Sequence, residues 1–282
     1  MKLPQFEYAA PATLAEAIAL LAQGNAKALA GGQSLIPTLA FRLAAPALLV
    51  DLGRIQGLGE IKITSHAIHV GSRVRWRDIE RDARLKSAHP LLVAAIAQVA
   101  HYQIRNRGTV GGSLAHADPA AEMPGIAVTC DAEISVSGSK GKRRVPAGEF
   151  FTGPLSTVLA DDELITEVRL PAWPASRCWG FEELARRRGD FAIAGVAAFY
   201  DVDGEGKAIN THIGVIGACT RPHRIAQAEA ALNGRVVDAA AIQAAARAAE
   251  KAVEPPEDLH ASAAYRRSLV GTLLERALGG AR

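Results

Sequence analysis

Two short segments with paired glycines constrain the fold of this chain most. The first is Gly31-Gly32-Gln33-Ser34-Leu35, the second is Gly111-Gly112-Ser113-Leu114, and a helical pattern follows each. Paired glycines let the backbone reach φ > 0 and approach a ligand closely, and consecutive N–H groups in such a turn bind anions. A helix N-terminus behind the turn adds a positive dipole end. Either segment alone is better explained as an ordinary turn, but together they predict a clamp that grips the diphosphate of a dinucleotide from two separate subdomains.

Other nucleotide-binding motifs are absent from the sequence. The fingerprint G-x-G-x-x-G needs a third glycine, which follows neither Gly57-Leu58-Gly59 nor Gly204-Glu205-Gly206. No phosphate loop of the form G-x-x-x-x-G-K-[ST] occurs either. The sequence therefore does not support a pyridine-nucleotide domain of the Rossmann type.

Length and composition restrict the class of function. At roughly 150 residues per domain, 282 residues predict about two domains, or one domain with a large appendage. The net charge of +3 is too balanced for a dedicated nucleic-acid or membrane-surface binder, and an aromatic share of 5% argues against a base-stacking platform. The longest apolar stretch, residues 91–100, is far shorter than the ~18 residues of a membrane span. We therefore expect no nucleic-acid partner and no membrane span.

Cysteine usage indicates a chain without its own metal centre. Cys130, Cys178 and Cys219 are odd in number and far apart, and no CxxC pair exists. Neither a zinc ribbon nor an iron–sulfur cluster can then be built from this chain alone, so no metal site is expected. A disulfide framework is equally unexpected, which fits a reducing cytoplasm. The first residues hold an early proline and an acid but no apolar core, so we expect no signal peptide and a cytoplasmic location.

The order of predicted elements indicates an α+β protein with runs of strands and helices rather than strict alternation. Residues 1–57 form a small α/β unit, and residues 58–174 form a larger unit of hairpins and helices. The cluster Pro171-Ala172-Trp173-Pro174 is the best boundary in the chain. In the larger unit, the pattern predicts helices at 76–85, 90–102 and 119–130, a loop at 105–118, and strands at 61–63, 68–70, 133–136, 143–145 and 164–170.

The last third of the chain, residues 175–282, is predicted to be a three-stranded antiparallel sheet followed by a helical bundle. The turn Asp203-Gly204-Glu205-Gly206 is a strong hairpin signal between the last two strands. The predicted strands are 179–186, 194–202 and 208–217, and the predicted Ala-rich helices are 225–232, 238–253 and 263–278.

Three stretches resemble the FAD-binding medium subunit of the molybdenum hydroxylases, the family of aerobic carbon monoxide dehydrogenase and xanthine dehydrogenase. They are Ala30 to Pro37, Arg105 to Pro119, and Arg187 to Ala194. The resemblance covers nearly the whole chain in order and length, and the second stretch is long and specific. It implies a two-subdomain FAD-binding domain of the vanillyl-alcohol-oxidase (PCMH) type, with subdomains 1–57 and 58–174, and then the C-terminal domain 175–282. FAD would lie in the cleft between the two subdomains.

The resemblance also implies which residues bind FAD. Backbone amides of Gly31 to Leu35 and of Gly111 to Ser113 would hold the diphosphate, and the Ser34, Thr109 and Ser113 hydroxyls would add donors. Glu122 and Ile165 would lie at the adenosine end, and Ile104 and Phe191 would lie beside the flavin ring. The implied cofactor-binding set is Ala30, Gly31, Gly32, Gln33, Ser34, Leu35, Ile104, Thr109, Gly111, Gly112, Ser113, Ala117, Asp118, Glu122, Ile165 and Phe191.

The sequence departs from the family pattern at one point. Relatives often carry a lysine near the flavin around Glu182 and Glu183, where this chain has two acids. His116 and Asp118, two residues apart, could form a catalytic dyad, but we favour positioning roles because Asp118 before Pro119 is also a good helix cap. No catalytic residue is expected in this chain.

The resemblance implies a role in electron transfer. FAD would pass electrons from a small subunit with two [2Fe–2S] clusters to an external acceptor, while a large subunit with the molybdenum cofactor hydroxylates the substrate. The expected assembly is a dimer of heterotrimers. Two alternatives remain open, which are a stand-alone FAD-dependent oxidoreductase of the same fold and a non-enzymatic assembly module that has lost its flavin. The substrate of the complex and its final electron acceptor are not indicated by this chain.

Overall fold

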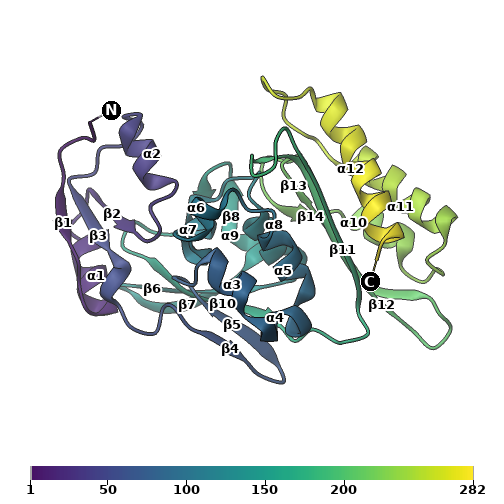
Figure 1. Ribbon diagram of the computed structural model, residues 1–282, viewed down its shortest axis with the longest axis horizontal. Helices are drawn as coiled ribbons and strands as arrows, with labels where there is room; N and C mark the ends of the chain where they lie inside the picture. The colour runs from purple at the N-terminus through teal and green to yellow at the C-terminus, as the bar shows by residue number, and fades with distance from the viewer. Residues whose placement is uncertain (1, 282) are drawn as a thin grey trace.

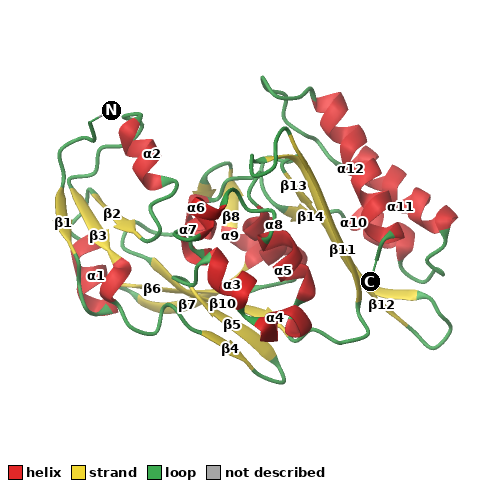
Figure 2. Cartoon of the chain, viewed as in Figure 1, coloured by secondary structure: helices red, strands yellow, loops and turns green. Residues whose placement is uncertain are grey.

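The computed structural model describes residues 2–281, which form three units arranged in a row (Figure 1). The N-terminal unit is a small parallel sheet with helices, and the middle unit is an antiparallel sheet with helices packed on it. The C-terminal unit is a second antiparallel sheet covered by helices (Figure 2). The mixed α+β class predicted from the sequence is confirmed. Across residues 2–281, no helix combines the length and the apolar character that crossing a membrane requires.

The N-terminal unit is held together by three short parallel strands. Its elements are β1 (Glu7–Ala9), α1 (Leu14–Leu21), β2 (Ala26–Leu29), α2 (Leu35–Ala40), β3 (Leu48–Asp51) and a 3-10 turn at Leu52–Arg54. Strand β3 lies in the middle and pairs with β1 and β2. Thr13 begins α1, because its hydroxyl accepts from the Glu16 N–H while the Glu16 carboxylate accepts from the Thr13 N–H. Ala17 and Leu21 of α1 then pack with Val50 in a small core.

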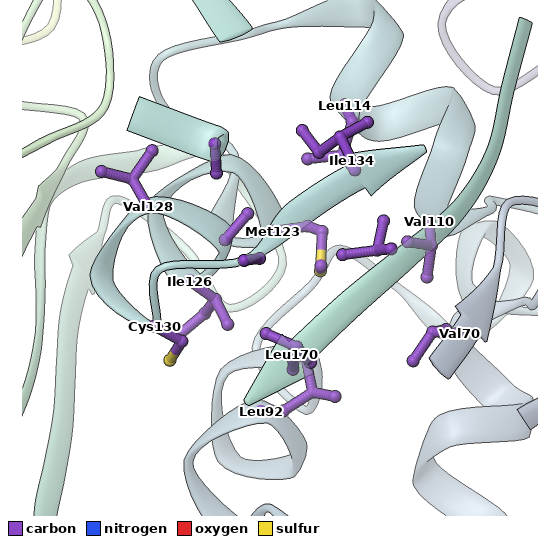
Figure 3. Packing of buried hydrophobic residues seen from close by; sticks show 14 of the residues in the cluster. Val70, Leu92, Val110, Leu114, Met123, Ile126, Val128, Cys130, Ile134 and Leu170 are labelled. Carbon is purple, nitrogen blue, oxygen red and sulfur yellow. The ribbon is translucent and has the colours of Figure 1, made fainter. Parts of the chain in front are cut away.

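The middle unit is a five-stranded antiparallel sheet in the order β4-β5-β10-β6-β7. Its strands are β4 (Ile61–Ile63), β5 (Ala67–Gly71), β6 (Glu133–Gly138), β7 (Gly141–Pro146), β8 (Phe151–Gly153), β9 (Ser156–Thr157) and β10 (Leu164–Pro171), of which β8 and β9 form a separate pair. Its helices are α3 (Trp76–Arg81), α4 (Ala83–Ala88), α5 (Pro90–Ile96), α6 (Tyr102–Arg105), α7 (Val110–His116), α8 (Glu122–Thr129) and α9 (Ala147–Phe150). Figure 3 shows side chains of α5, α7 and α8 packing against those of β5, β6 and β10 in the largest core.

Two helices expected from the sequence are shorter than predicted. The helix expected at 76–85 is divided at Asp82, whose carboxylate accepts from the Arg84 N–H and so begins a new helix, α4. The helix expected at 90–102 ends at Ile96, and the chain then turns through Ala100, which has φ +43°. The apolar pattern predicts too long a helix, because residues beyond Ile96 are also apolar and pack on the core without being helical.

The C-terminal unit contains four strands, which corrects the predicted three. Its elements are β11 (Cys178–Ala185), β12 (Ala192–Val202), β13 (Ala208–Ile216), β14 (His223–Arg224), α10 (Ala226–Leu232), α11 (Ala239–Ala252) and α12 (Ala263–Gly279). The fourth strand, β14, was missed because it is two residues long and pairs only with Gly214 and Val215 of β13. All four strands are antiparallel, in the order β11-β12-β13-β14.

Strand β12 joins the middle and C-terminal units because its two faces pack on different cores. Ala197 and Phe199 belong to the core of the middle unit, whereas Val196 and Ala198 pack under the C-terminal helices. Successive side chains of a strand point to opposite faces, so an apolar strand can serve two cores at once. The C-terminal sheet is therefore covered by α5 and α8 on one face and by α10, α11 and α12 on the other.

Candidate functional site

A large cavity lies where the three units meet. Its volume is about 1570 Å³, and all three units contribute to its lining. Pockets for drug-sized ligands have volumes of roughly 300–1,000 Å³, so this cavity has room for a larger molecule. Both glycine segments line it, the first from the N-terminal unit and the second from the middle unit.

The first glycine segment, between β2 and α2, presents unpaired backbone donors. Within residues 2–281, the N–H groups of Gly32, Gln33 and Ser34 have no acceptor. The side-chain amide of Gln33 donates to the carbonyl of Gly31 at 3.0 Å, and Gly32 has φ +71°, a conformation that glycine adopts without strain. Three consecutive free N–H groups in a fixed turn form a concavity suited to an anion.

The first glycine segment contacts the backbone that precedes the second one. A Cβ atom placed on Gly31 would overlap the carbonyl oxygen of Arg107, just before the second segment. A Cβ atom on Gly111 would lie 2.6 Å from the Cβ of Ser72, because the Gly111 N–H donates to the Ser72 carbonyl at 2.8 Å. Glycine is therefore needed at Gly31 and Gly111 for close approach rather than for an unusual φ angle.

The second segment is helical, whereas the sequence predicted a loop over 105–118. Thr109 caps α7 by accepting from the Gly112 N–H at 3.2 Å, so the paired glycines lie in the first turn of a helix. The amides of Gly111, Gly112 and Ser113 already donate to Ser72, to the Thr109 hydroxyl and to the Thr109 carbonyl. The expectation that these three amides are free for a ligand is therefore corrected, and the free amides come from the first segment.

The structure brings together nearly all of the residues implied by the sequence. Those that line the cavity are Ala30, Gly31, Gly32, Gln33, Ser34, Leu35, Ile104, Thr109, Gly111, Gly112, Ser113, Asp118, Glu122, Ile165 and Phe191. Ala117 is outside the lining; it is 1% exposed and its carbonyl accepts from the Leu155 N–H. Phe191 is 62% exposed at the edge of the cavity. Asp118 accepts from the Ala120 N–H at 2.9 Å. It is not the helix cap expected from the sequence, because α8 begins at Glu122 after Ala121 rather than at Pro119.

The inner wall of the cavity carries an unusual acid. Glu122 is the first residue of α8 and is only 5% exposed. Burial raises the pKa of Glu122 to about 8, and the nearby carboxyl of Glu183 raises it further in the same direction. Burial also raises the pKa of Glu183 to about 7.

The matches to known families cover both halves of the chain. Residues 4–173 match the FAD binding domain in molybdopterin dehydrogenase, and residues 179–281 match the CO dehydrogenase flavoprotein C-terminal domain. The chain is an FAD-binding medium subunit of the molybdenum hydroxylase family.

Individual relatives of this flavoprotein subunit agree with the family match. The chain is 38% identical to the alpha subunit of the 6-hydroxypseudooxynicotine dehydrogenase complex of Paenarthrobacter nicotinovorans, over 100% of this chain and 96% of the relative. A solved structure of carbon monoxide dehydrogenase from Hydrogenophaga pseudoflava superposes with TM-score 0.95 at 38% identity, over 99% of this chain and 98% of that one. Quinoline 2-oxidoreductase from Pseudomonas putida 86 superposes with TM-score 0.94 at 38% identity, over 99% and 98%.

FAD is thus the cofactor of this flavoprotein subunit, and the chain is part of an oxidoreductase. Features of the cavity fit a dinucleotide independently of the family match. Ser72 lines the cavity, and its hydroxyl is buried without a hydrogen-bond partner in the described part of the chain, as expected of a polar group beside a ligand site. Because Gly31 and Gly111 carry no Cβ, the backbone at each can lie close to a neighbouring segment, and the walls of the cavity depend on these close contacts.

Several lining residues of the flavoprotein subunit were missed from the sequence. Ser72 and Trp76 follow β5, and Arg266 and Asp258 come from the C-terminal unit. The Arg266 guanidinium donates to the carbonyls of Ile193 and Gly217 and to Asp258. No local pattern marks these residues, because they reach the cavity only through the packing of distant elements.

Proposed function

We propose that this chain holds FAD and transfers electrons from the [2Fe–2S] clusters of a partner subunit to an external acceptor. The observation that carries the proposal is the meeting of two glycine segments, from separate units, in the wall of one large cavity. FAD, when bound, supplies the ability to exchange electrons singly or in pairs. The residues of the chain bind and shield the cofactor rather than make or break substrate bonds.

The proposed roles of the residues follow from their free polar groups. The unpaired amides of Gly32, Gln33 and Ser34 bind the diphosphate from one side. The Ser113 hydroxyl, which lines the cavity from α7, donates from the other side. Ile165 and Glu122 accommodate the adenosine half, and Ile104 and Phe191 contact the flavin ring. The remaining residues implied by the sequence, Ala117 included, keep the proposed role of shaping these walls.

Partner subunits supply the other redox centres in this proposal. Cys130 and Cys219 are buried in different units, and the chain's only other cysteine is Cys178, so a cluster within this chain has no set of ligands. We propose a small [2Fe–2S] subunit and a large molybdenum-cofactor subunit in a dimer of heterotrimers in the cytoplasm. Within the chain, we propose the domains 1–57, 58–174 and 175–282, of which Met1 and Arg282 lie outside the described residues.

The residues at the edge of the cavity favour electron transfer between a bound flavin and other molecules. Phe191 is an aromatic residue with most of its surface exposed, and it lies next to the run Arg186 to Arg188. A flavin ring against Phe191 would be close to the surface, which is the position that electron exchange with a partner requires. The basic run would then assist docking of the partner, while the nearby Asp190 completes the turn.

Co-expression of the full chain with the other subunits tests this function. The purified complex should contain one FAD per chain together with iron and molybdenum, and its flavin should be reduced when the substrate of the complex is added. The full chain alone, loaded with FAD, should not oxidise such substrates. Steady turnover by the chain alone would support the stand-alone oxidoreductase, and a chain that binds no FAD would support the assembly module.

A further inference from the structure

The carboxyl groups of Glu122 and Glu183 come from two units that pack against each other beside the cavity, and of the two only Glu122 lines it. Glu122 begins α8 in the middle unit and lines the cavity. Glu183 lies in β11 and is paired with Gly195 of β12, so it comes from the C-terminal unit. Alternation along β11 places Glu183 on the same face as Trp179 and Phe181, which pack on the core of the middle unit. Glu183 therefore points toward the side of the sheet on which α8 packs.

Tight packing at this junction brings α8 and β12 together beside Glu183. A Cβ atom on Gly125 of α8 would overlap the Ile216 side chain, and a Cβ atom on Gly195 would lie 3.4 Å from Ile216. Ile216 thus holds α8 and β12 together. A Cβ on Gly195 would also lie 3.5 Å from the Cγ of Glu183, so the Glu183 side chain lies alongside this contact and close to the first turn of α8.

Within residues 2–281, neither carboxyl group is paired with another side chain. The Oε2 atom of Glu183 is buried and unpartnered. The Glu122 carboxyl makes no ion pair in this range and is hydrogen-bonded only to the backbone of Glu122 itself. A buried carboxylate without a partner pays a large desolvation cost, which a proton removes. When two such carboxyl groups lie close together, the negative charge of one further disfavours ionisation of the other.

The charged groups around the pair do not neutralise it. Asp118, before α8, adds a negative charge on the same side. Arg266 of α12 is occupied by two backbone carbonyls and by Asp258. His116, at the end of α7, and Arg186, after β11, line the same cavity as Glu122, and Arg186 contacts His260. The remaining titratable groups from packed elements lie elsewhere. His89 begins α5, and His212 of β13 and Arg224 of β14 bind beside Thr129 and Asp131 at the far end of α8.

We propose that Glu122 and Glu183 form a proton-holding carboxyl pair that couples retention of FAD to protonation of the cavity wall. This inference rests on the proposed binding of FAD in the cavity. FAD would cover Glu122 and separate it from water, and its diphosphate adds negative charge, so the cofactor binds best while the pair keeps its protons. Linkage then requires that FAD binding takes up protons in the pH range where the empty pair would have begun to lose them.

The pH dependence of FAD affinity in the full chain tests the pair. With the raised pKa values of about 7 for Glu183 and about 8 for Glu122, the Kd for FAD should be flat near pH 6 and rise above pH 7. The rise should approach roughly tenfold per pH unit for each proton taken up. Equilibrium dialysis from pH 6 to pH 9 measures it. An affinity that is constant over this range, or that increases with pH, would overturn the proposal.

Substitutions separate the pair from other acids of the chain. The double variant Glu122→Gln with Glu183→Gln should keep the shape of the wall and bind FAD with the same Kd at pH 6 and pH 9. The matched control is Glu182→Gln, which removes the neighbouring acid on the opposite face of β11 and should keep the wild-type rise. A rise that persists in the double variant would assign the pH dependence to other groups and overturn the proposal.

Infrared spectroscopy of the apo full chain provides a readout that does not depend on FAD. The wild type should show a protonated-carboxyl carbonyl band at pH 6.5 that disappears by about pH 9, and the double variant should lack this band. If the chain binds no FAD at any pH, the proposed function fails while the band still reports on the pair. If FAD binds but the band is absent from the wild type at pH 6.5, only the pair fails.

Discussion

At the scale of single residues, the cavity depends on a position that has no side chain. Gly31 carries no Cβ, and the space that a Cβ would occupy is filled by the backbone of Arg107 and Gly108. The contact joins two segments that are about 75 residues apart in the chain, so a single glycine determines whether the two walls can close. The neighbouring free amides of Gly32 to Ser34 depend on the same turn.

The variant Gly31→Ala tests this close approach. Its methyl group would collide with backbone, which cannot rotate away, so the two segments must separate. We expect a loss of ~1–3 kcal/mol in the free energy of unfolding, typical of overpacking, together with loss of FAD on gel filtration. The matched control is Gly148→Ala in α9, where a Cβ meets no atom within 4 Å, and which should keep FAD and full stability. Retention of FAD by Gly31→Ala would contradict the assignment.

At the scale of elements, two helices are begun by the same kind of cap but only one lies at the cavity. Thr109 begins α7 by accepting from the Gly112 N–H, and Asp238 begins α11 by accepting from the Ala241 N–H at 2.8 Å. Thr109 is buried in the cavity wall, whereas α11 packs in the C-terminal unit. The two side chains therefore cap their helices with the same kind of hydrogen bond, but only Thr109 lies at the cavity.

The paired variants Thr109→Ala and Asp238→Ala separate stability from cofactor binding. Each removes one cap and should lower the free energy of unfolding by about 0.5–2 kcal/mol, measured by urea denaturation. Only Thr109→Ala should also weaken FAD binding, because α7 carries the second glycine segment. Thr109→Ser should restore both properties. Equal loss of FAD affinity in Asp238→Ala would mean that general destabilisation, rather than the position of α7, accounts for the effect.

Elements with a strong local signal were predicted well from the sequence. The cap at Thr13 and the hairpin turn at residues 203–206 each depend on neighbouring residues, and the structure contains the corresponding helix and hairpin. The edge strand β1 and the short strand β14 were not predicted, because each is only two or three residues long and exists through pairing with a distant strand.

The site was predictable where a motif carried it and unpredictable where only packing did. The glycine segments and the residues around them were found because paired glycines are visible in the sequence. The helical state of residues 110–116 was missed, because glycines have low helix propensity and the cap at Thr109 was taken as part of a loop. Ser72 and Arg266 reach the cavity from distant elements and left no local signal.

At the scale of the whole molecule, one aromatic cluster links the middle and C-terminal units. Trp173 packs against both His89 and Phe199, with ring centroids 4.4 and 5.1 Å apart. The Arg177 guanidinium lies over the Trp173 and Phe199 rings and makes two hydrogen bonds of 2.8 Å to Asp201. The cavity spans both units, so this cluster helps to keep its walls in place.

The variant Arg177→Lys tests the linking cluster. A lysine cannot make the paired contact with Asp201 or stack as a flat group, so we expect a loss of about 1.5–3 kcal/mol in the free energy of unfolding at pH 7. Arg84→Lys is the matched control, because Arg84 also contacts its aspartate with two nitrogens but is 62% exposed, and it should cost less than about 1 kcal/mol. Equal losses in the two variants would contradict the role of the cluster.

The same pair predicts a pH dependence in the acid range. Hydrogen bonding to Arg177 lowers the pKa of Asp201 below its ordinary value of 3.8. A lowered pKa in the folded state means that the contribution to stability is complete above the ordinary value and is lost as the pH falls through the lowered value. The difference between wild type and Arg177→Lys should therefore be constant from pH 5 to pH 8 and shrink below about pH 4. A difference that grows on acidification would contradict this account.

The central claim is that one FAD diphosphate is bound between the two glycine segments, and a crystal structure of the full chain with FAD tests it most directly. The account predicts that the phosphate oxygens accept hydrogen bonds from the amides of Gly32, Gln33 and Ser34, and that the Ser113 hydroxyl reaches them from the opposite wall. A diphosphate that contacts only one of the two segments, or that lies outside the cavity between them, would contradict the account.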